Sequence, residues 1–317
     1  HALRHLRQGR VYCAKPAPDQ ATCDSITFPI PLLAAQEYSR MSDGKKKTAC
    51  IFFRKGSCRN GDTCPFSHDP NAPEAPAPER SPNGERPKRQ APRPVMVPYD
   101  ANTPYFSIDV ECVATAKTHN ARATAQIALV SADETSRLNL YVKPAEQVVS
   151  YLEPLTGLSK SSLDKQGIGL EEAMLKVREK LPKNAVLVGQ NIGKDVEWLQ
   201  LKEGEDFAGM IDLAVLIRVW NPKYGSLTYF GLDHAASCWL GKANDGAAHN
   251  AETDAIKSMQ IFNLYCRAQN DAAELQRLHE ALLSRPVAPS FAKLNPEYEG
   301  CCMGNKKSCT CGAPFFS

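Results

Sequence analysis

The second half of the chain carries apolar patterns that predict alternating strands and helices. Three β-prone runs come first, at residues 105–110, 124–131 and 137–142. Helical periodicity follows at residues 170–181, 194–201, 227–240, 251–268 and 271–283, and an apolar strand at 185–189 lies between the first two helices. The apolar run 211–217 fits either a strand or a helix. This order of elements predicts an α/β domain with a mixed sheet.

Proline content separates this domain from the part of the chain that precedes it. Residues 69–98 contain nine prolines and almost no large apolar side chains, so they cannot form a core and are predicted to be extended. The predicted organisation has five parts. They are an N-terminal extension (1–44), a cysteine-containing module (45–69), a Pro-rich linker (70–102), the α/β domain (103–285) and a Cys-rich tail (286–317).

The overall composition, with 43% hydrophobic and 23% charged residues, is that of an ordinary globular protein. The net charge of +3 does not by itself indicate a nucleic-acid partner. Basic residues do cluster, for example at Lys45–Lys47 and Lys306–Lys307, although such runs are most often solvated. We expect no membrane partner, because no apolar run reaches roughly 18 residues and the N-terminus lacks a secretory signal. The chain begins with His1 rather than Met, which indicates a fragment or the remainder of a tag.

Most of the twelve cysteines fall into two groups, one near residue 58 and one in the tail. Such clustering suits metal ligation in a reducing compartment better than an evenly spread disulfide framework. We therefore expect an intracellular protein of the nucleus or the cytoplasm. The basic segment 84–94 favours the nucleus if it acts as a weak import signal, and otherwise it is a charged linker.

The module at 45–69 contains a zinc-type set of donors at short spacings. Its members are Cys50, Cys58, Cys64 and His68. Three thiolates and one imidazole form a tetrahedral set for structural Zn²⁺, and a module of about 25 residues cannot fold without the metal. The C-x₇-C-x₅-C-x₃-H spacing resembles CCCH zinc fingers, which implies binding of single-stranded RNA. Phe52 and Phe53 lie among basic residues and are candidate RNA contacts, unless they form the small core of the finger or the finger binds a protein.

Acidic residues lie at the ends of elements in the α/β domain. Asp109 and Glu111 close the first strand, where residues two apart point to the same face. Such close carboxylates repel each other, and a hard divalent cation compensates for that repulsion. Asp195 lies in the first turn of a helix, and His249 and Asp254 mark the start of another. Taken singly, each has a structural alternative: a solvated strand end, a charge at a helix N-terminus or a structural histidine.

Together, the order of these segments, their strand and helix context and the H-x₄-D spacing resemble the DEDDh family of 3′–5′ exonucleases. The resemblance covers residues 104–285 and includes the intervening segments PLTGL (154–158), MIDL (210–213) and SLTY (226–229). The first motif is similar to that of the RNA-trimming and oligoribonucleolytic branches. The resemblance implies a ribonuclease-H-like mixed sheet flanked by helices, in addition to the small CCCH finger.

The resemblance also implies a role for each residue. Asp109 would bridge two Mg²⁺ or Mn²⁺ ions. Glu111 and Asp254 would complete the site of the attacking water, and Asp195 would support the second ion through water. His249 would be the general base, because a neutral imidazole accepts a proton near pH 7. The products would be nucleoside 5′-monophosphates released from a free 3′ end.

We therefore expect an enzyme that trims or degrades the 3′ ends of single-stranded RNA, with the finger capturing the RNA. One alternative is a DNA-directed exonuclease of the same chemistry, and another is an RNA- or protein-binding regulator with vestigial activity. Cys112 and Val113 directly follow the first motif and are candidate contacts to the terminal nucleotide. Packing inside the sheet is the alternative for both residues.

The cysteines of the tail predict either a second metal site or incidental thiols in a disordered segment. They are Cys301, Cys302, Cys309 and Cys311. Adjacent Cys301 and Cys302 rarely bind the same ion. A complete metal site would therefore need a further donor, from Cys13, Cys23 or the α/β domain.

Overall fold

The computed structural model describes residues 48–56, 64, 66–73, 91–242 and 246–315. The chain divides into two compact units, His1–Pro87 and Lys88–Ser317. Their boundary lies inside the segment predicted to be a Pro-rich linker. Across the described ranges, no helix combines the length and the apolar character needed to cross a membrane.

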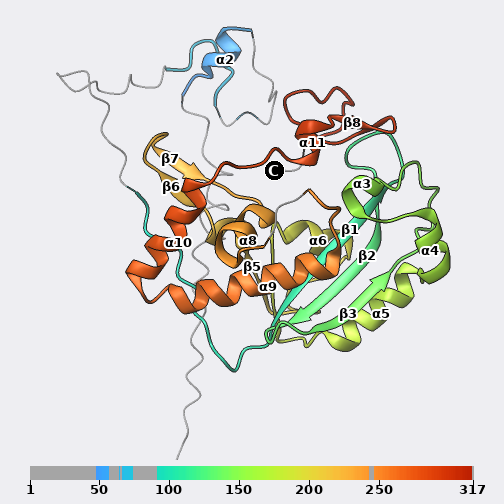
Figure 1. The fold of residues 1–317 in the computed structure, drawn as a ribbon. Coiled ribbons are helices and arrows are strands. Elements are labelled where there is room, and N and C mark those ends of the chain that lie inside the picture. The colour runs from blue at the N-terminus through green and yellow to red at the C-terminus, as the bar shows by residue number, and fades with distance from the viewer. Residues whose placement is uncertain (1–47, 57–63, 65, 74–90, 243–245, 316–317) are drawn as a thin grey trace, which may run out of the picture. The chain divides into compact units, whose positions relative to one another are not determined.

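A five-stranded mixed sheet forms the centre of the second unit (Figure 1). Its strands run in the order β3 (Ser136–Tyr141), β2 (Arg122–Ser131), β1 (Tyr105–Ala114), β4 (Val186–Gly189) and β5 (Gly209–Asp212). β1 and β3 are antiparallel to β2, whereas β4 is parallel to both β1 and β5. The predicted fold class, an α/β ribonuclease-H-like mixed sheet flanked by helices, is confirmed.

Helices lie on both faces of this sheet, and short elements connect them. The helices that precede β5 in the chain are α3 (Glu153–Thr156), α4 (Lys160–Gln166), α5 (Leu170–Lys180) and α6 (Gly193–Trp198). Those after it are α7 (Leu213–Leu216), α8 (Leu232–Leu240), α9 (Ala251–Ala268) and α10 (Ala272–Ser284). A small antiparallel hairpin, β6 (Val219–Asn221) and β7 (Ser226–Thr228), precedes α8.

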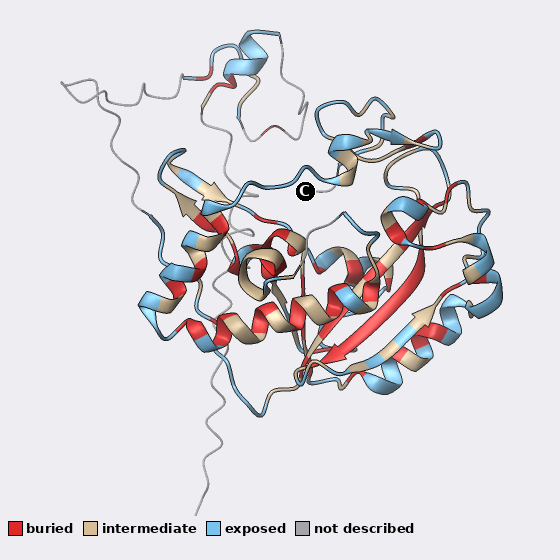
Figure 2. Cartoon of the chain, viewed as in Figure 1, coloured by how far each residue is buried: buried red, intermediate tan, exposed pale blue. Residues whose placement is uncertain are grey.

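Successive side chains of β2 point to opposite faces of the sheet, so this one strand contributes to two hydrophobic cores. Ile127 and Leu129 point to the face covered by α5 and α6, and Ala128 and Val130 point to the face covered by α8 and α9. All four side chains are fully buried, and β2 is buried along most of its length in Figure 2. A strand buried on both faces reads as a continuous apolar run, which is what residues 127–130 show.

Two of the predicted elements differ from those observed. The ambiguous run 211–217 is divided at Asp212, which ends β5 and caps α7 by accepting a hydrogen bond from the backbone N–H of Ala214 at 2.8 Å. The prediction of one helix over 227–240 is wrong at its start. Residues 226–228 pair with β6, and Gly231 then precedes the helix, which begins only at Leu232.

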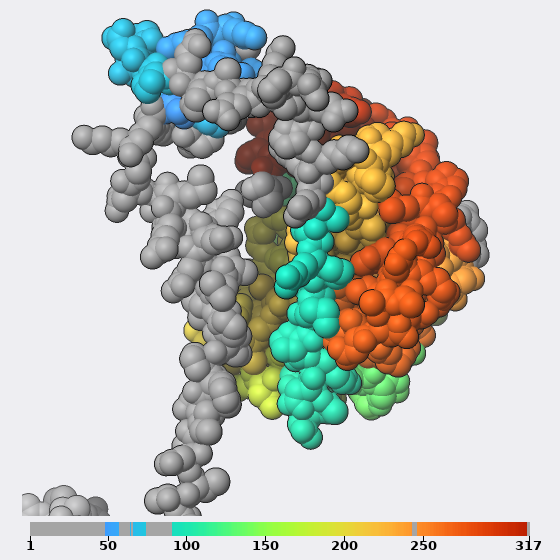
Figure 3. Space-filling model, turned by 90° about the vertical axis from the view of Figure 1, so that its left-hand side faces the viewer, coloured from blue at the N-terminus to red at the C-terminus, as the bar shows by residue number. Residues whose placement is uncertain are grey.

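The end of the predicted linker packs on the second unit. Val97 is buried in the main core, and its backbone N–H and C=O are both held by the side-chain amide of Gln269, at 2.8 and 3.1 Å. The hydroxyl of Tyr265 donates to the carbonyl of Val95 at 2.6 Å. In Figure 3 this segment (teal) runs as a strip beside the orange C-terminal helices. Core packing therefore reaches back at least to Val95.

The tail also folds onto this unit. It contains α11 (Phe291–Leu294) and an antiparallel hairpin of β8 (Glu297–Tyr298) and β9 (Cys301–Cys302). Cys301 is fully buried and packs with Ala114, at the end of β1, and with Leu152. The tail is therefore folded up to residue 315, so its cysteines occupy defined positions.

We predict that Gln269→Ala lowers the free energy of unfolding by about 2–4 kcal/mol, because it leaves the buried N–H and C=O of Val97 without their partners. Urea denaturation of the whole chain measures this change. The matched control is Gln276→Ala, which removes an exposed amide on α10 and should change stability by no more than about 0.5 kcal/mol. Equal effects of the two substitutions would contradict the docking of the Val95–Val97 segment.

Candidate active site

β1 carries two carboxylates on one face of the sheet. Asp109 and Glu111 alternate with Ile108 and Val110, whose side chains pack in the core under α5 and α6. The pairing of β1 with β2 shifts register immediately after Glu111, where Ala125 has no partner. A bulge of this kind bends a strand and redirects its side chains, and such bulges are frequent beside active sites. The two acids thus lie directly before this irregularity, after which β1 continues to pair with β2 as far as Ala114.

Asp195 comes to the same place from α6. The turn before this helix contains Asn191 with φ 55°, and the carboxylate of Asp212 holds it by accepting the Asn191 N–H at 2.9 Å. Asp195 itself is buried, and the backbone of Val110 on β1 hydrogen-bonds its carboxylate. The MIDL segment therefore has a structural role, which is to support the turn that presents Asp195.

His249 and Asp254 lie at the start of α9. Asn250 caps this helix, since its side chain accepts from the backbone N–H groups of Glu252 and Thr253. His249 Nδ1 is 2.7 Å from Asp254 Oδ2. The backbone N–H of His249 donates to the carbonyl of Leu155 at 2.7 Å. The PLTGL segment is thus a support for the histidine.

Lys257 and Asp233 were not predicted from the sequence and extend this group. The Lys257 ammonium lies 2.8 Å from Asp254 Oδ1 and 2.8 Å from Asp233 Oδ1. Asp233 Oδ2 is 3.8 Å from His249 Nε2. Lys257 is one helical turn after Asp254, a spacing at which side chains meet. That spacing was the available signal, whereas the partner Asp233 on α8 depends on helix packing.

The carboxylates perturb one another strongly. Burial, together with the charges of Asp195, Asp254 and Glu111, raises the pKa of Asp109 well above its usual range. Burial raises the pKa of Glu111 to about 8 and that of Asp195 to about 7. Asp254 differs, because hydrogen bonds from His249 and Lys257 outweigh its burial and lower its pKa. Without a bound cation, Asp109, Glu111 and Asp195 therefore favour the protonated form.

This donor set fits divalent metal ions. Ligand atoms of Glu111, His249 and Asp254 lie within 4.8 Å of one another. Asp109 and Asp195 are outside that tight group but are close to it, since Glu111 and Asp254 raise the pKa of Asp109 and Asp195 raises that of Glu111. Carboxylate oxygens are the ligands that Mg²⁺ and Mn²⁺ prefer, and a cation would favour the ionised form of these acids, whose pKa values are raised mainly by burial.

The structure places Cys112 and Val113 inside the fold. Both side chains are buried, Cys112 in the core under α5 and α6 and Val113 beside Ala125, Leu158 and Leu163. These positions favour strand packing, the alternative for both residues, and contact with a nucleotide stays a prediction.

The first unit contains three of the four predicted zinc ligands within the described residues. Ligand atoms of Cys50, Cys64 and His68 lie within 4.8 Å of one another, while Cys58 is outside the described ranges. Both described cysteines are buried, and His68 Nε2 has no hydrogen-bond partner among the described residues. A short helix, α2 (Ile51–Arg54), begins at Cys50, whose sulfur accepts the N–H of Phe53 at 3.3 Å. This arrangement fits Zn²⁺.

Comparison with known proteins supports two predictions, the zinc finger and the resemblance to exonucleases. A family model of the CCCH type, described as a zinc finger domain, matches residues 50–68. Small RNA degrading nuclease 3 of Arabidopsis thaliana is 28% identical over 163 residues, which cover 50% of this chain and 20% of that protein. RNA exonuclease 5 of Bos taurus is 25% identical over 210 residues, covering 63% of this chain and 25% of that protein. The resemblance to RNA exonucleases is confirmed.

The matched part of this chain spans only 20% and 25% of the length of these two curated relatives. Among solved structures, the Neurospora crassa Pan2 catalytic unit (protease and nuclease domain) is similar over 63% of this chain and 34% of that chain. The sequences are 16% identical, and the TM-score is 0.48.

We predict that the second unit without bound divalent ions becomes less stable as pH rises from about 5 to about 8. Unfolded carboxyls titrate near pH 4, whereas Glu111 and Asp195 in the folded domain titrate near 8 and 7. The folded state therefore holds extra protons in this window, and its stability falls as they are lost. The raised pKa of His249 acts in the same direction. Thermal unfolding of protein dialysed free of Mg²⁺ and Mn²⁺ measures the trend.

Two comparisons make this test specific. Glu111→Gln should flatten the decline in Tm with pH, because it removes the carboxyl with a pKa of about 8. Added Mg²⁺ should raise the Tm of the unsubstituted chain most at pH 8, where the acids are ionised. A Tm that is insensitive to Mg²⁺ at pH 8 would contradict a metal site at these residues.

Proposed function

We propose that this protein is a divalent-metal-dependent 3′–5′ exoribonuclease that shortens single-stranded RNA from its 3′ end. The observation that carries the proposal is the convergence of Asp109, Glu111, Asp195 and Asp254 with His249 at one end of the sheet. Support for RNA as the substrate comes from the relatives, which are named as RNA exonucleases and small RNA degrading nucleases. The CCCH finger supports the same substrate class.

The four carboxylates would hold the metal ions. Two divalent ions in such a site supply electrostatic stabilisation of the attacking and leaving oxygens during phosphodiester hydrolysis. Strand β1 fixes Asp109 and Glu111, and the turn held by Asp212 fixes Asp195. The site is therefore preorganised before substrate arrives. We assign Mg²⁺ or Mn²⁺ because all the acidic donors are oxygens.

His249 is the proposed general base. Its Nδ1 faces the carboxylate of Asp254 at 2.7 Å, so Nδ1 carries the proton in the neutral ring and Nε2 is left with a lone pair. Nε2 would accept the proton from the attacking water. The hydrogen bond from the His249 backbone to Leu155 holds the residue at the start of α9 and limits rotation of the loop.

The finger would capture RNA by stacking and charge. Phe52, Phe53 and Phe66 are 58%, 43% and 48% exposed, so they do not form a buried core. Phe53 stacks on His68 with ring centroids 4.1 Å apart, and all three phenylalanine rings are partly exposed to solvent. Lys55 is exposed beside them. Aromatic faces among cations are the usual means of binding single strands.

An intracellular place of action, in the nucleus or the cytoplasm, belongs to this proposal. Seven of the twelve cysteines lie in two clusters, three at residues 50–64 and four at residues 301–311, and such clustering suits metal ligation in a reducing compartment.

The nuclease assay uses a 5′-labelled single-stranded RNA with a free 3′ hydroxyl, the same RNA with a blocked 3′ end, and the matched DNA. We expect a ladder of shortened RNA and release of nucleoside 5′-monophosphates only with Mg²⁺ or Mn²⁺. Asp109→Asn should nearly abolish turnover, and His249→Ala should lower kcat by about 10²–10⁴-fold. Asp133→Asn, which removes an exposed carboxylate outside the site, is the matched control and should leave kcat unchanged.

Each of the other possible outcomes has a clear meaning. Equal shortening of DNA would indicate a nuclease without sugar preference. No metal-dependent hydrolysis of either strand would favour a regulator with vestigial activity. Full activity in Asp109→Asn would remove the basis of the proposal.

Disruption of the finger should weaken capture without altering the chemical step. We predict that Cys64→Ser raises KM several-fold for long RNA and leaves kcat within about twofold, since tethering acts through the local concentration of substrate. Steady-state kinetics with a long RNA and a dinucleotide measure this difference. The dinucleotide cannot reach both units, so its KM should be unchanged. An equal rise of KM for both substrates would argue against RNA capture by the finger.

A further inference from the structure

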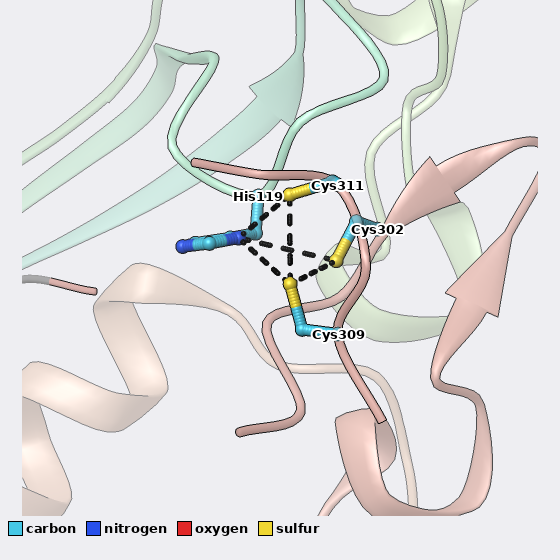
Figure 4. Close-up of side chains that lie close together, drawn as sticks. All are labelled: His119, Cys302, Cys309 and Cys311. Atoms are coloured by element: carbon cyan, nitrogen blue, oxygen red, sulfur yellow. Dashed lines mark hydrogen bonds between the residues drawn. The ribbon is translucent and has the colours of Figure 1, made fainter. Parts of the chain in front are cut away.

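Four potential metal ligands outside the active site come together from two distant parts of the nuclease unit. His119 lies in the connection between β1 and β2, and Cys302, Cys309 and Cys311 lie in the tail. Figure 4 shows the three sulfur atoms and His119 Nδ1 pointing toward one common point. All four ligand atoms lie within 4.8 Å of one another. The exonuclease body thus supplies the donor that the tail cysteines lack.

The distances match the edges of a zinc tetrahedron. His119 Nδ1 is 3.2 Å from Cys311 Sγ, 3.6 Å from Cys309 Sγ and 3.9 Å from Cys302 Sγ. Cys309 Sγ is 3.5 Å from both other sulfur atoms. With Zn–S near 2.3 Å and Zn–N near 2.0–2.1 Å, a regular tetrahedron has S···S edges of about 3.8 Å and N···S edges of about 3.6 Å. These sulfur separations are far too long for disulfides.

Strand alternation explains which of the two adjacent cysteines takes part. Cys301 and Cys302 are neighbours on β9, so their side chains point to opposite faces. Cys301 is fully buried beside Ala114 and Leu152. Cys302 faces the other way, toward His119. Only Cys302 of the pair faces the other ligands, so two adjacent residues need not bind the same ion.

Neighbouring groups orient the ligands as they do in metal sites. His119 Nε2 donates to the carbonyl of Pro314 at 3.1 Å, which leaves Nδ1 as the free donor atom for a metal. The backbone N–H of Gly304 points to Cys302 Sγ at 3.5 Å. Gly304 has φ +73°, and a Cβ atom there would meet the Cβ of His119 at 3.4 Å. The chain therefore approaches the histidine closely at a residue without a side chain.

The backbones that carry the ligands are already joined. The N–H of Cys302 donates to the carbonyl of Lys117 at 2.7 Å. The guanidinium of Arg122 donates to the carbonyls of Thr118 and Cys302, at 3.0 and 2.9 Å. These bonds hold the tail against the β1–β2 connection in the arrangement that the four donors need.

We propose that His119, Cys302, Cys309 and Cys311 bind a structural zinc ion that fastens the tail to the end of β1. Three thiolates and an imidazole complete a tetrahedron, so no position is left open for water or substrate, as in structural rather than catalytic zinc sites. This site is separate from the finger, whose ligands all come from residues 50–68. It does not depend on the proposed nuclease activity.

Zinc content of the whole chain tests the proposal. After exchange into buffer with excess Mg²⁺, elemental analysis should find about two zinc ions per chain, one in each Cys₃His set. The double substitution Cys50→Ser/Cys64→Ser should remove one ion, Cys309→Ser should remove the other, and the combination should remove both. One zinc ion in the unsubstituted chain, or loss of all zinc in Cys50→Ser/Cys64→Ser, would overturn the proposal.

Cobalt spectroscopy provides a readout that does not depend on the folding of a tail variant. Co²⁺ added to the Cys50→Ser/Cys64→Ser chain should show the intense thiolate-to-cobalt charge-transfer band and the visible bands of a tetrahedral site. The oxygen ligands of the active site cannot produce this charge transfer. Absence of the band would contradict the tail site.

Substitutions in the same finger-silenced chain separate ligation from general damage. His119→Ala should abolish tight Co²⁺ binding at the tail, and His119→Cys should restore it with a stronger charge-transfer band because a fourth thiolate is added. Cys238→Ser, which removes a thiol on α8 outside the group, is the matched control and should leave the spectrum unchanged. Retention of the unaltered spectrum in His119→Ala would exclude His119 as a ligand.

Discussion

Negative charge confined to a small desolvated volume is the constraint on which the nuclease unit depends. Asp109, Glu111 and Asp195 each have a raised pKa because they are buried near other acids. A fold without a use for this arrangement would gain stability by replacing the acids. The acids are kept together by the sheet, by the turn that Asp212 holds before α6 and by the start of α9. This arrangement makes the site suitable for binding cations.

Asp254 shows how part of this charge is offset within the protein. His249 and Lys257 both hydrogen-bond its carboxylate, so its pKa falls while the others rise. Lys257 also contacts Asp233 on α8, which connects the acid group to helix packing behind it. The four proposed metal ligands therefore differ: neighbouring cations favour the ionised form of Asp254, whereas Asp109, Glu111 and Asp195 have raised pKa values.

The sequence predicts what depends on local spacing and misses what depends on packing. Asp109 with Glu111, and His249 with Asp254, are detectable because two-residue and helical periods place them together. Lys257 has the right spacing from Asp254, but nothing local identifies Asp233 as its partner. His119 precedes Cys302 by most of the nuclease unit, so no motif could include it. The packing at the end of the predicted linker was missed for the same reason, because the burial of Val97 depends on Gln269 far along the chain.

The same distinction separates the two Cys₃His groups energetically. The finger's ligands span under 20 residues, and so zinc there stabilises a module that has almost no other core. The tail group joins residue 119 to residue 311 on a body that is already folded and hydrogen-bonded between Lys117, Arg122 and Cys302. An ion that binds only the native arrangement stabilises every element enclosed between its ligands. Those elements run from β2 to β9 and include Asp195 and Asp254, so metal bound in the tail would reinforce the scaffold that holds the buried carboxylates together.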